Sequence, residues 1–182
     1  DFIMVLRKKF LISTSKINIS YHKQFFIGGI NIAYGDGLYI NVKKHLLPLP
    51  MVLTYSLYQL IQVIRLVKIH EVSLIHANWI FPQGLVAVIY KKIFNNKIKV
   101  LTTVHGSDYW RFNFFPFSHL IRAVLNNSDL ITVVSSSIKT SLIQSGIRRT
   151  IYTSPMGIDT KLFNPDKKDV SLREQHNIKG PF

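Results

Sequence analysis

At 182 residues, 47% of them hydrophobic, the chain is long and apolar enough for one globular domain, which excludes an intrinsically disordered protein. The formal charge of +14 and the isoelectric point near 10.1 indicate an anionic partner, such as a phosphorylated substrate, an acidic membrane face or nucleic acid. The sequence contains no cysteine, which excludes a disulfide framework, a thiolate nucleophile and a Cys-ligated zinc site.

The first fifty residues carry short strand signals. Phe2–Leu6 predicts a buried strand, and Phe25–Gly29 predicts a second strand that ends in a glycine pair. Tyr34–Gly37 is a turn signal, and the alternation in Leu38–Val42 predicts a strand after it, which together suggest a hairpin. Because the chain does not begin with Met and stops after a polar segment, we expect a fragment of a longer protein.

A long apolar segment, Met51–Ile69, follows two prolines and predicts a mostly buried helix. A helix that crosses a membrane and a helix that lies on a membrane face are the alternatives. The spanning alternative is disfavoured because polar side chains recur at every third position and interrupt the apolar run. They are Gln59, Gln62, Arg65 and Lys68.

From Val72 onward, predicted strands and helices alternate along the chain. The expected strands are Val72–Ile75, Ile98–Val104, Leu130–Val134 and Ile151–Thr153. The expected helices are Gln83–Phe94, a helix that ends at Leu125, and Ser135–Ser145. Connections of this length are typical of βαβ units, so the sequence predicts an α/β fold, a parallel sheet with helices on both faces.

Polar and small residues follow the predicted strands. His105-Gly106-Ser107-Asp108 comes directly after the predicted strand Ile98–Val104, and His76 and Ser135 follow two other predicted strands. Right-handed crossovers bring the carboxyl ends of parallel strands to one edge, so we expect these groups and the Met156-Gly157 turn to line one crevice. The structural alternatives remain open: a histidine hydrogen-bonded inside a turn, and a serine that only caps a helix.

Four segments then resemble a known family. They are HANWIFPQGLVA (residues 76–87), TTVHGSDYW (102–110), DLITVVSSS (129–137) and SPMGIDTKLFNP (154–165). In this order and at this spacing they are similar to the N-terminal domain of retaining glycosyltransferases of family 4. The resemblance implies one Rossmann-like half of a two-domain GT-B fold over residues 1–165, with the first strand and its glycine-rich loop missing. Residues 166–182 would begin the linker or the second domain.

The resemblance assigns the central role to His105, which would donate a hydrogen bond to the donor sugar near its reacting carbon. Gly106 would allow the backbone to approach that sugar closely, because a Cβ atom would crowd it. Asp108 would fix the loop or the histidine, and a helix cap is the structural alternative for its carboxylate.

Three further residues are expected to contact substrate: His76 on the acceptor side, Ser135 on the wall of the cleft, and Gly157 in the turn that leads to the linker. Met156 stands where many relatives have Asn. Aromatic side chains at the same rim suit sugar rings and lipid tails, and several of them would serve only as core. They are Trp79, Phe81, Tyr109, Trp110, Phe112, Phe114 and Phe115.

By the same resemblance, the complete enzyme would transfer a hexosyl unit from a nucleotide sugar to a glycan or lipid-linked acceptor. Its phosphate-binding groups would lie mainly in the second domain, so we expect this chain alone to be inactive. We expect no cofactor and no metal, because the sequence has neither an Asp-x-Asp pair nor an HExxH motif.

Other functions stay open at this point. A sugar-nucleotide epimerase would keep the fold and change the reaction, whereas a noncatalytic module would use its basic surface to dock to an anionic membrane or polymer. The basic residues are scattered along the sequence, so we expect no nucleic-acid partner. The expected location is the cytoplasm, with the protein peripheral on the inner membrane face. Basic residues clustered beside His105 would favour a phosphate-bearing acceptor, and basic residues far from it would favour docking.

Overall fold

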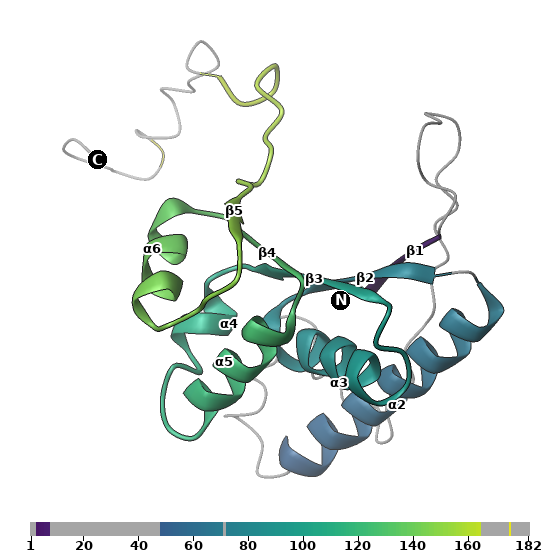
Figure 1. The fold of residues 1–182 in the computed structure, drawn as a ribbon. Coiled ribbons are helices and arrows are strands. Elements are labelled where there is room, and N and C mark those ends of the chain that lie inside the picture. The colour runs from purple at the N-terminus through teal and green to yellow at the C-terminus, as the bar shows by residue number, and fades with distance from the viewer. Residues whose placement is uncertain (1–2, 8–47, 71, 165–174, 176–182) are drawn as a thin grey trace.

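A computed structural model of the chain describes residues 3–7, 48–70, 72–164 and 175 (Figure 1). These residues build a five-stranded sheet in the order β1-β2-β3-β4-β5. The expectations for Phe25–Gly29 and Tyr34–Val42, and for a domain boundary at residue 165, lie outside the described residues.

The sheet is parallel over four neighbouring strands. They are β2 (Val72–Asn78), β3 (Lys99–Val104), β4 (Leu130–Val133) and β5 (Ile151–Thr153). The prediction of an α/β fold with a parallel sheet is therefore confirmed. Strand β1 (Ile3–Arg7) differs, because it pairs with β2 in the antiparallel direction, with Met4 opposite His76.

The described helices pack beneath one face of the sheet (Figure 1). They are α2 (Pro48–Ile69), α3 (Leu85–Ile93), α4 (Ser107–Trp110), α5 (Phe117–Asn127) and α6 (Ser136–Gln144). A kinked segment, η1 (Ile80–Gly84), precedes α3, and its residue Phe81 has extended backbone angles. From β2 to β5 each strand lies beside the one before it, so right-handed connections place every intervening helix on the same side. The expectation of helices on the second face as well is not tested by these residues.

The core lies between this face and the helices. Alternate strand residues, such as Ile75 and Ala77 in β2 and Ile131 and Val133 in β4, are fully buried and belong to one apolar cluster with side chains of the helices. The residues between them, His76 among them, are half-buried and face the other side of the sheet. The buried residues therefore form the apolar face of the sheet towards the helices, and the half-buried residues form a more polar face on the other side.

Helix α2 is long and apolar enough to cross a membrane over Val52–Ile69 when judged by length and composition alone. Its inner side chains Val52, Tyr55, Gln59 and Val63 are buried against the domain. The prediction of a mostly buried helix is nevertheless wrong, because 22% of the Val52–Ile69 window is buried and Leu53, Leu57 and Ile61 are exposed. These residues do not test the alternative of a helix that lies on a membrane face.

Candidate functional site

His105 directly follows the last residue of β3, at the edge where the parallel strands end. Its side chain is half-buried, and its Nε2 atom is buried without a hydrogen-bond partner. A buried, unpartnered ring nitrogen is uncommon, because it loses its water contacts and gains nothing in exchange. The structure thus leaves one hydrogen-bonding position of the His105 ring unused, although the atom itself has almost no exposed surface.

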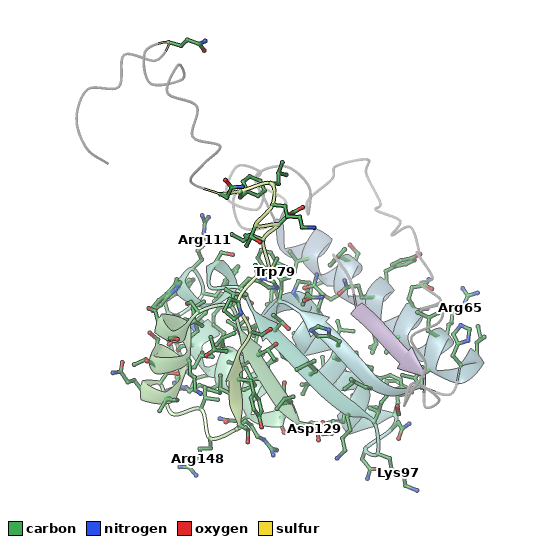
Figure 2. All side chains as sticks on the ribbon, turned by 90° about the horizontal axis from the view of Figure 1, so that it is seen from above. Arg65, Trp79, Lys97, Arg111, Asp129 and Arg148 are labelled. Carbon is green, nitrogen blue, oxygen red and sulfur yellow. The ribbon has the colours of Figure 1, made fainter. Side chains whose placement is uncertain are left out.

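Trp79 stacks on His105, with ring centroids 5.5 Å apart and planes inclined by 29°. Its backbone φ of 96° is unusual for a non-glycine residue. Two hydrogen bonds hold this strained conformation: the Trp79 N–H donates to the Thr103 carbonyl over 2.9 Å, and the Gly84 N–H donates to the Trp79 carbonyl over 3.1 Å. The indole is still 37% exposed, so the stacked pair offers an aromatic surface beside the histidine (Figure 2).

Asp108 connects the two loops that carry this pair. Its Oδ2 accepts the N–H of Ile80 over 2.8 Å, and its Oδ1 accepts the N–H groups of His105 over 3.1 Å and Gly106 over 3.0 Å. The residue is 1% exposed. Burial raises the pKa of Asp108, while the backbone hydrogen bonds and the nearby His105 oppose that rise. The predicted loop-fixing role therefore fits the geometry, and direct substrate contact does not, because the carboxylate is enclosed.

Gly106 is required by the local backbone. Its φ is +99°, and a Cβ atom there would lie 3.1 Å from Cδ1 of Ile138 in α6. We expected the missing side chain to make room for a sugar. The structure corrects this reason, because the space beside Gly106 is already taken by α6.

His76 lies inside β2, and its predicted position at the end of a strand is wrong. The strand continues to Asn78 because residues 77 and 78 still pair with β3. The His76 Nε2 is 2.7 Å from Thr103 Oγ1 on the half-buried face, and Thr103 Oγ1 is 2.6 Å from Thr132 Oγ1. Burial lowers the pKa of His76, and the neighbouring His105 lowers it further. The two histidines are therefore near enough for the charge of His105 to influence the pKa of His76.

Ser135 caps α6 as its structural interpretation predicted, since its Oγ accepts the N–H of Ile138 over 3.4 Å. It lies near His105, because Val134, the residue before it, donates its N–H to the carbonyl of Val104. Gly157 differs from the expectation. It is exposed, on a segment that leaves the sheet after β5, and a Cβ atom added to it would meet no other atom within 4 Å (Figure 1).

The sequence pattern therefore indicates His105 and its link to Asp108, but not the stacking of Trp79 on the histidine or the bond from Ile80 to Asp108. Trp79 was only one of several aromatic residues at the rim, and no spacing rule pointed to the hydrogen bond between Asp108 and Ile80, which lie 28 positions apart. Within the part of the chain that the structure describes, no three His, Asp or Glu side chains gather in a group that could hold a metal ion. The absence of a metal requirement stays a prediction.

Together, the site offers a ring nitrogen without a partner, a half-exposed indole and a carboxylate that positions both. An unpartnered imidazole nitrogen can hydrogen-bond a sugar hydroxyl, and an aromatic face can pack on the apolar face of a sugar ring. The model of Glycosyltransferase Family 4 matches residues 27–162, which include all these groups. The chain belongs to glycosyltransferase family 4.

Two individual proteins are similar to parts of this family-4 chain. It is 30% identical over 69 residues to N-acetyl-alpha-D-glucosaminyl L-malate synthase of Bacillus anthracis, a match that covers 37% of this chain and 18% of that protein. Its fold is similar to sucrose-phosphate synthase of Thermosynechococcus elongatus, with a TM-score of 0.53 and 19% identity over 73% of this chain and 34% of the other. The described sheet and helices thus have the GT-B type of glycosyltransferase fold, and the matches span about a third or less of the length of these two relatives.

Proposed function

We propose that the complete protein transfers a hexosyl unit, with retention, from a nucleotide sugar to a glycan or lipid-linked acceptor. This chain would form the acceptor-side half of the cleft. The family membership supports sugar transfer in general. The observation that carries the site is the buried, unpartnered Nε2 of His105 beneath the Trp79 indole, at the edge where the strands end.

In this proposal each group near His105 has a distinct task. In the transition state positive charge develops on the sugar ring and negative charge on the departing phosphate. The His105 side chain hydrogen-bonds the donor sugar and holds it in the reacting orientation, while the indole of Trp79 packs against a sugar face. Asp108 acts as a positioning residue through its bonds to Ile80, His105 and Gly106.

Three further parts of the proposal concern what surrounds the reaction. The phosphate-stabilising groups come mainly from the second domain, so this chain alone does not turn over substrate. The reaction uses no metal or other cofactor, and the protein works in the cytoplasm, peripheral on the inner membrane face. Its net charge of +14 supports an anionic surface as a partner. Nucleic acid is not among the proposed partners.

The test uses the full-length protein with a panel of nucleoside diphosphate sugars and the glycan acceptors of its source. We expect release of the nucleoside diphosphate together with a glycosylated product that keeps the anomeric configuration, resolved by NMR. His105→Ala should lower kcat by about a hundredfold, the size expected for one lost transition-state hydrogen bond. Ser107→Ala, at the exposed neighbouring position, is the matched control and should leave kcat unchanged.

Two outcomes would overturn this proposal. Unaltered transfer by the folded His105→Ala variant would remove the role given to that residue. Conversion of a donor to its sugar epimer without any acceptor product would instead assign an epimerase to the same fold. EDTA should leave the rate unchanged, and a loss of activity restored by a divalent cation would contradict the metal-free reaction.

A further inference from the structure

The edge of the sheet opposite His105 is strongly basic. Exposed cationic side chains lie there at the ends of α2 and α3 and just before or at the starts of β3 and β5, and we refer to them as the basic edge. They are Lys68, Lys92, Lys97, Lys99, Arg148 and Arg149. Figure 2 shows Lys97 and Arg148 on this edge, with Trp79 on the other side of the molecule.

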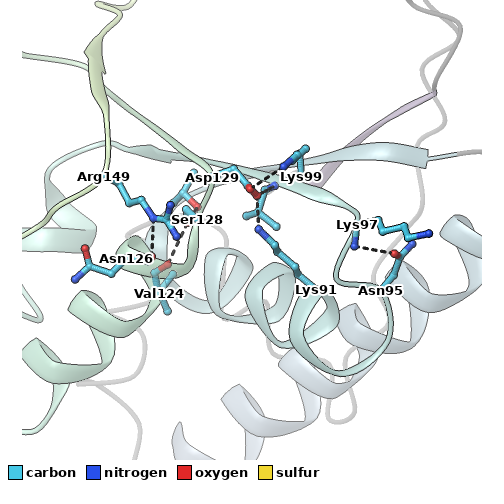
Figure 3. Close-up of polar contacts among 11 residues, drawn as sticks. Lys91, Asn95, Lys97, Lys99, Val124, Asn126, Ser128, Asp129 and Arg149 are labelled. Carbon is cyan, nitrogen blue, oxygen red and sulfur yellow. Dashed lines mark hydrogen bonds and ion pairs between the residues drawn. The ribbon is translucent and has the colours of Figure 1, made fainter.

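Among the residues that the structure describes, acidic side chains neutralise little of this charge. Among the described residues, Asp129 is the one carboxylate at this edge, and it already contacts Lys91 at 2.5 Å and Lys99 at 3.4 Å (Figure 3). It also accepts the N–H of Val100 over 2.8 Å. Asp129 therefore has a structural task between α3, β3 and β4, and the exposed cations around it leave a large positive excess.

Exposed apolar side chains accompany the basic edge. Ile69 at the end of α2 is 68% exposed, and Ile93 and Phe94 at the end of α3 are 70% and 51% exposed. The ring of Phe94 stacks on Tyr90, with centroids 5.6 Å apart, which fixes its position on the helix end. Both helices end at the side of the sheet where the strands begin, so apolar and cationic groups share one surface.

This mixture favours one class of anionic partner. A bilayer with acidic headgroups attracts clustered lysines and arginines and accepts apolar side chains at the headgroup level. A nucleic-acid strand also attracts cations and could stack a base on Phe94, but it gains nothing from the exposed aliphatic groups Ile69 and Ile93. The location matters too, because basic residues far from His105 are those expected for docking and not for binding a phosphate at the site.

We propose that the basic edge docks on an anionic lipid bilayer, with Ile69, Ile93 and Phe94 reaching the headgroup layer. This inference deepens the proposed peripheral location and rests on it. Docked in this way, the strand-end edge with His105 points away from the bilayer. The acceptor that reaches His105 must then extend from the membrane, as a glycan chain does.

The experiment is vesicle co-sedimentation of the full-length protein without substrates, using phosphatidylcholine alone or mixed in equal amounts with phosphatidylglycerol. We expect binding only to the mixed vesicles. Lys92→Glu/Lys97→Glu should weaken that binding about tenfold or more, since cations near an anionic surface each contribute substantially. The matched control, Lys139→Glu/Lys161→Glu, changes the net charge equally, places the changes on α6 and after β5, and should bind normally.

The apolar contribution has its own matched pair. Phe94→Ser should weaken binding to mixed vesicles, whereas Leu53→Ser, a similarly exposed position near the far end of α2, should not. Equal losses in both charge variants, or a loss in Leu53→Ser alone, would overturn the assignment to this edge. Equally tight binding to single-stranded DNA, with release from vesicles by that DNA, would assign a nucleic-acid surface instead. Substrate-free sedimentation and sugar transfer fail independently, so each result tests one proposal.

Discussion

Replacing Asp108 by Asn should separate the two loops of the site without unfolding the domain. The asparagine oxygen can still accept the N–H groups of His105 and Gly106, but its amide then faces the N–H of Ile80 as a second donor. An unsatisfied buried N–H costs about 1 to 3 kcal/mol of the free energy of unfolding. The loss of the buried charge offsets part of this cost, because burial already raises the pKa of Asp108.

We therefore expect Asp108→Asn to lower the free energy of unfolding by about 1 to 3 kcal/mol and Asp108→Ala, which removes every acceptor, by about 3 to 5 kcal/mol. Hydrogen exchange of individual amides gives the sharper assay. In Asp108→Asn the amide of Ile80 should exchange faster while that of Gly106 keeps its protection. Unchanged protection of Ile80 in this variant would refute the positioning role, and Ser107→Ala serves as the control, with no change at either amide.

Three further predictions follow from the same contacts. Gly106→Ala should lower the free energy of unfolding by about 1 to 3 kcal/mol because of its positive φ and the nearby α6 side chain, whereas Gly157→Ala should change it by less than about 0.5 kcal/mol in urea titrations. His76 should titrate below its ordinary value by NMR, so protonation below about pH 6.5 destabilises the fold. His105→Gln should raise the pKa of His76 only part of the way back to its ordinary value, because burial is the larger cause of the lowering. Burial would raise the pKa of Asp129, but hydrogen bonds and lysine charges lower it overall, so its stabilisation should be complete above about pH 3.8 and disappear as the pH falls through the lowered pKa. Asp129→Asn should lack this acid-dependent loss in urea midpoints, and an identical pH profile would contradict the assignment.

The alternating strands and helices could be predicted because each element repeats a clear local pattern. The predicted strand Ile151–Thr153 matches β5, and the expected cap at Ser135 begins α6 one residue later. His105 was placed correctly because the β-branched run before it ends abruptly in small polar residues. These are properties of neighbouring residues, which a sequence displays directly.

Positions that depend on distant partners could not be predicted in the same way. His76 was placed at a strand end because a polar side chain interrupts an apolar run, yet in a strand with one open face such a residue belongs to the alternation. The positive φ of Trp79 depends on hydrogen bonds to Thr103 and Gly84. Antiparallel pairing of β1 likewise depends on a partner far along the chain, and local periodicity does not encode it.

The most direct test of the site is a crystal structure of the full-length protein with its nucleotide-sugar donor bound. The account predicts that Nε2 of His105 lies within hydrogen-bond distance, about 3 Å, of a hydroxyl group of the donor sugar. It also predicts that the indole of Trp79 stays at the same edge. A donor bound with its sugar away from the strand ends, and with Nε2 of His105 still unpartnered, would contradict the central claim.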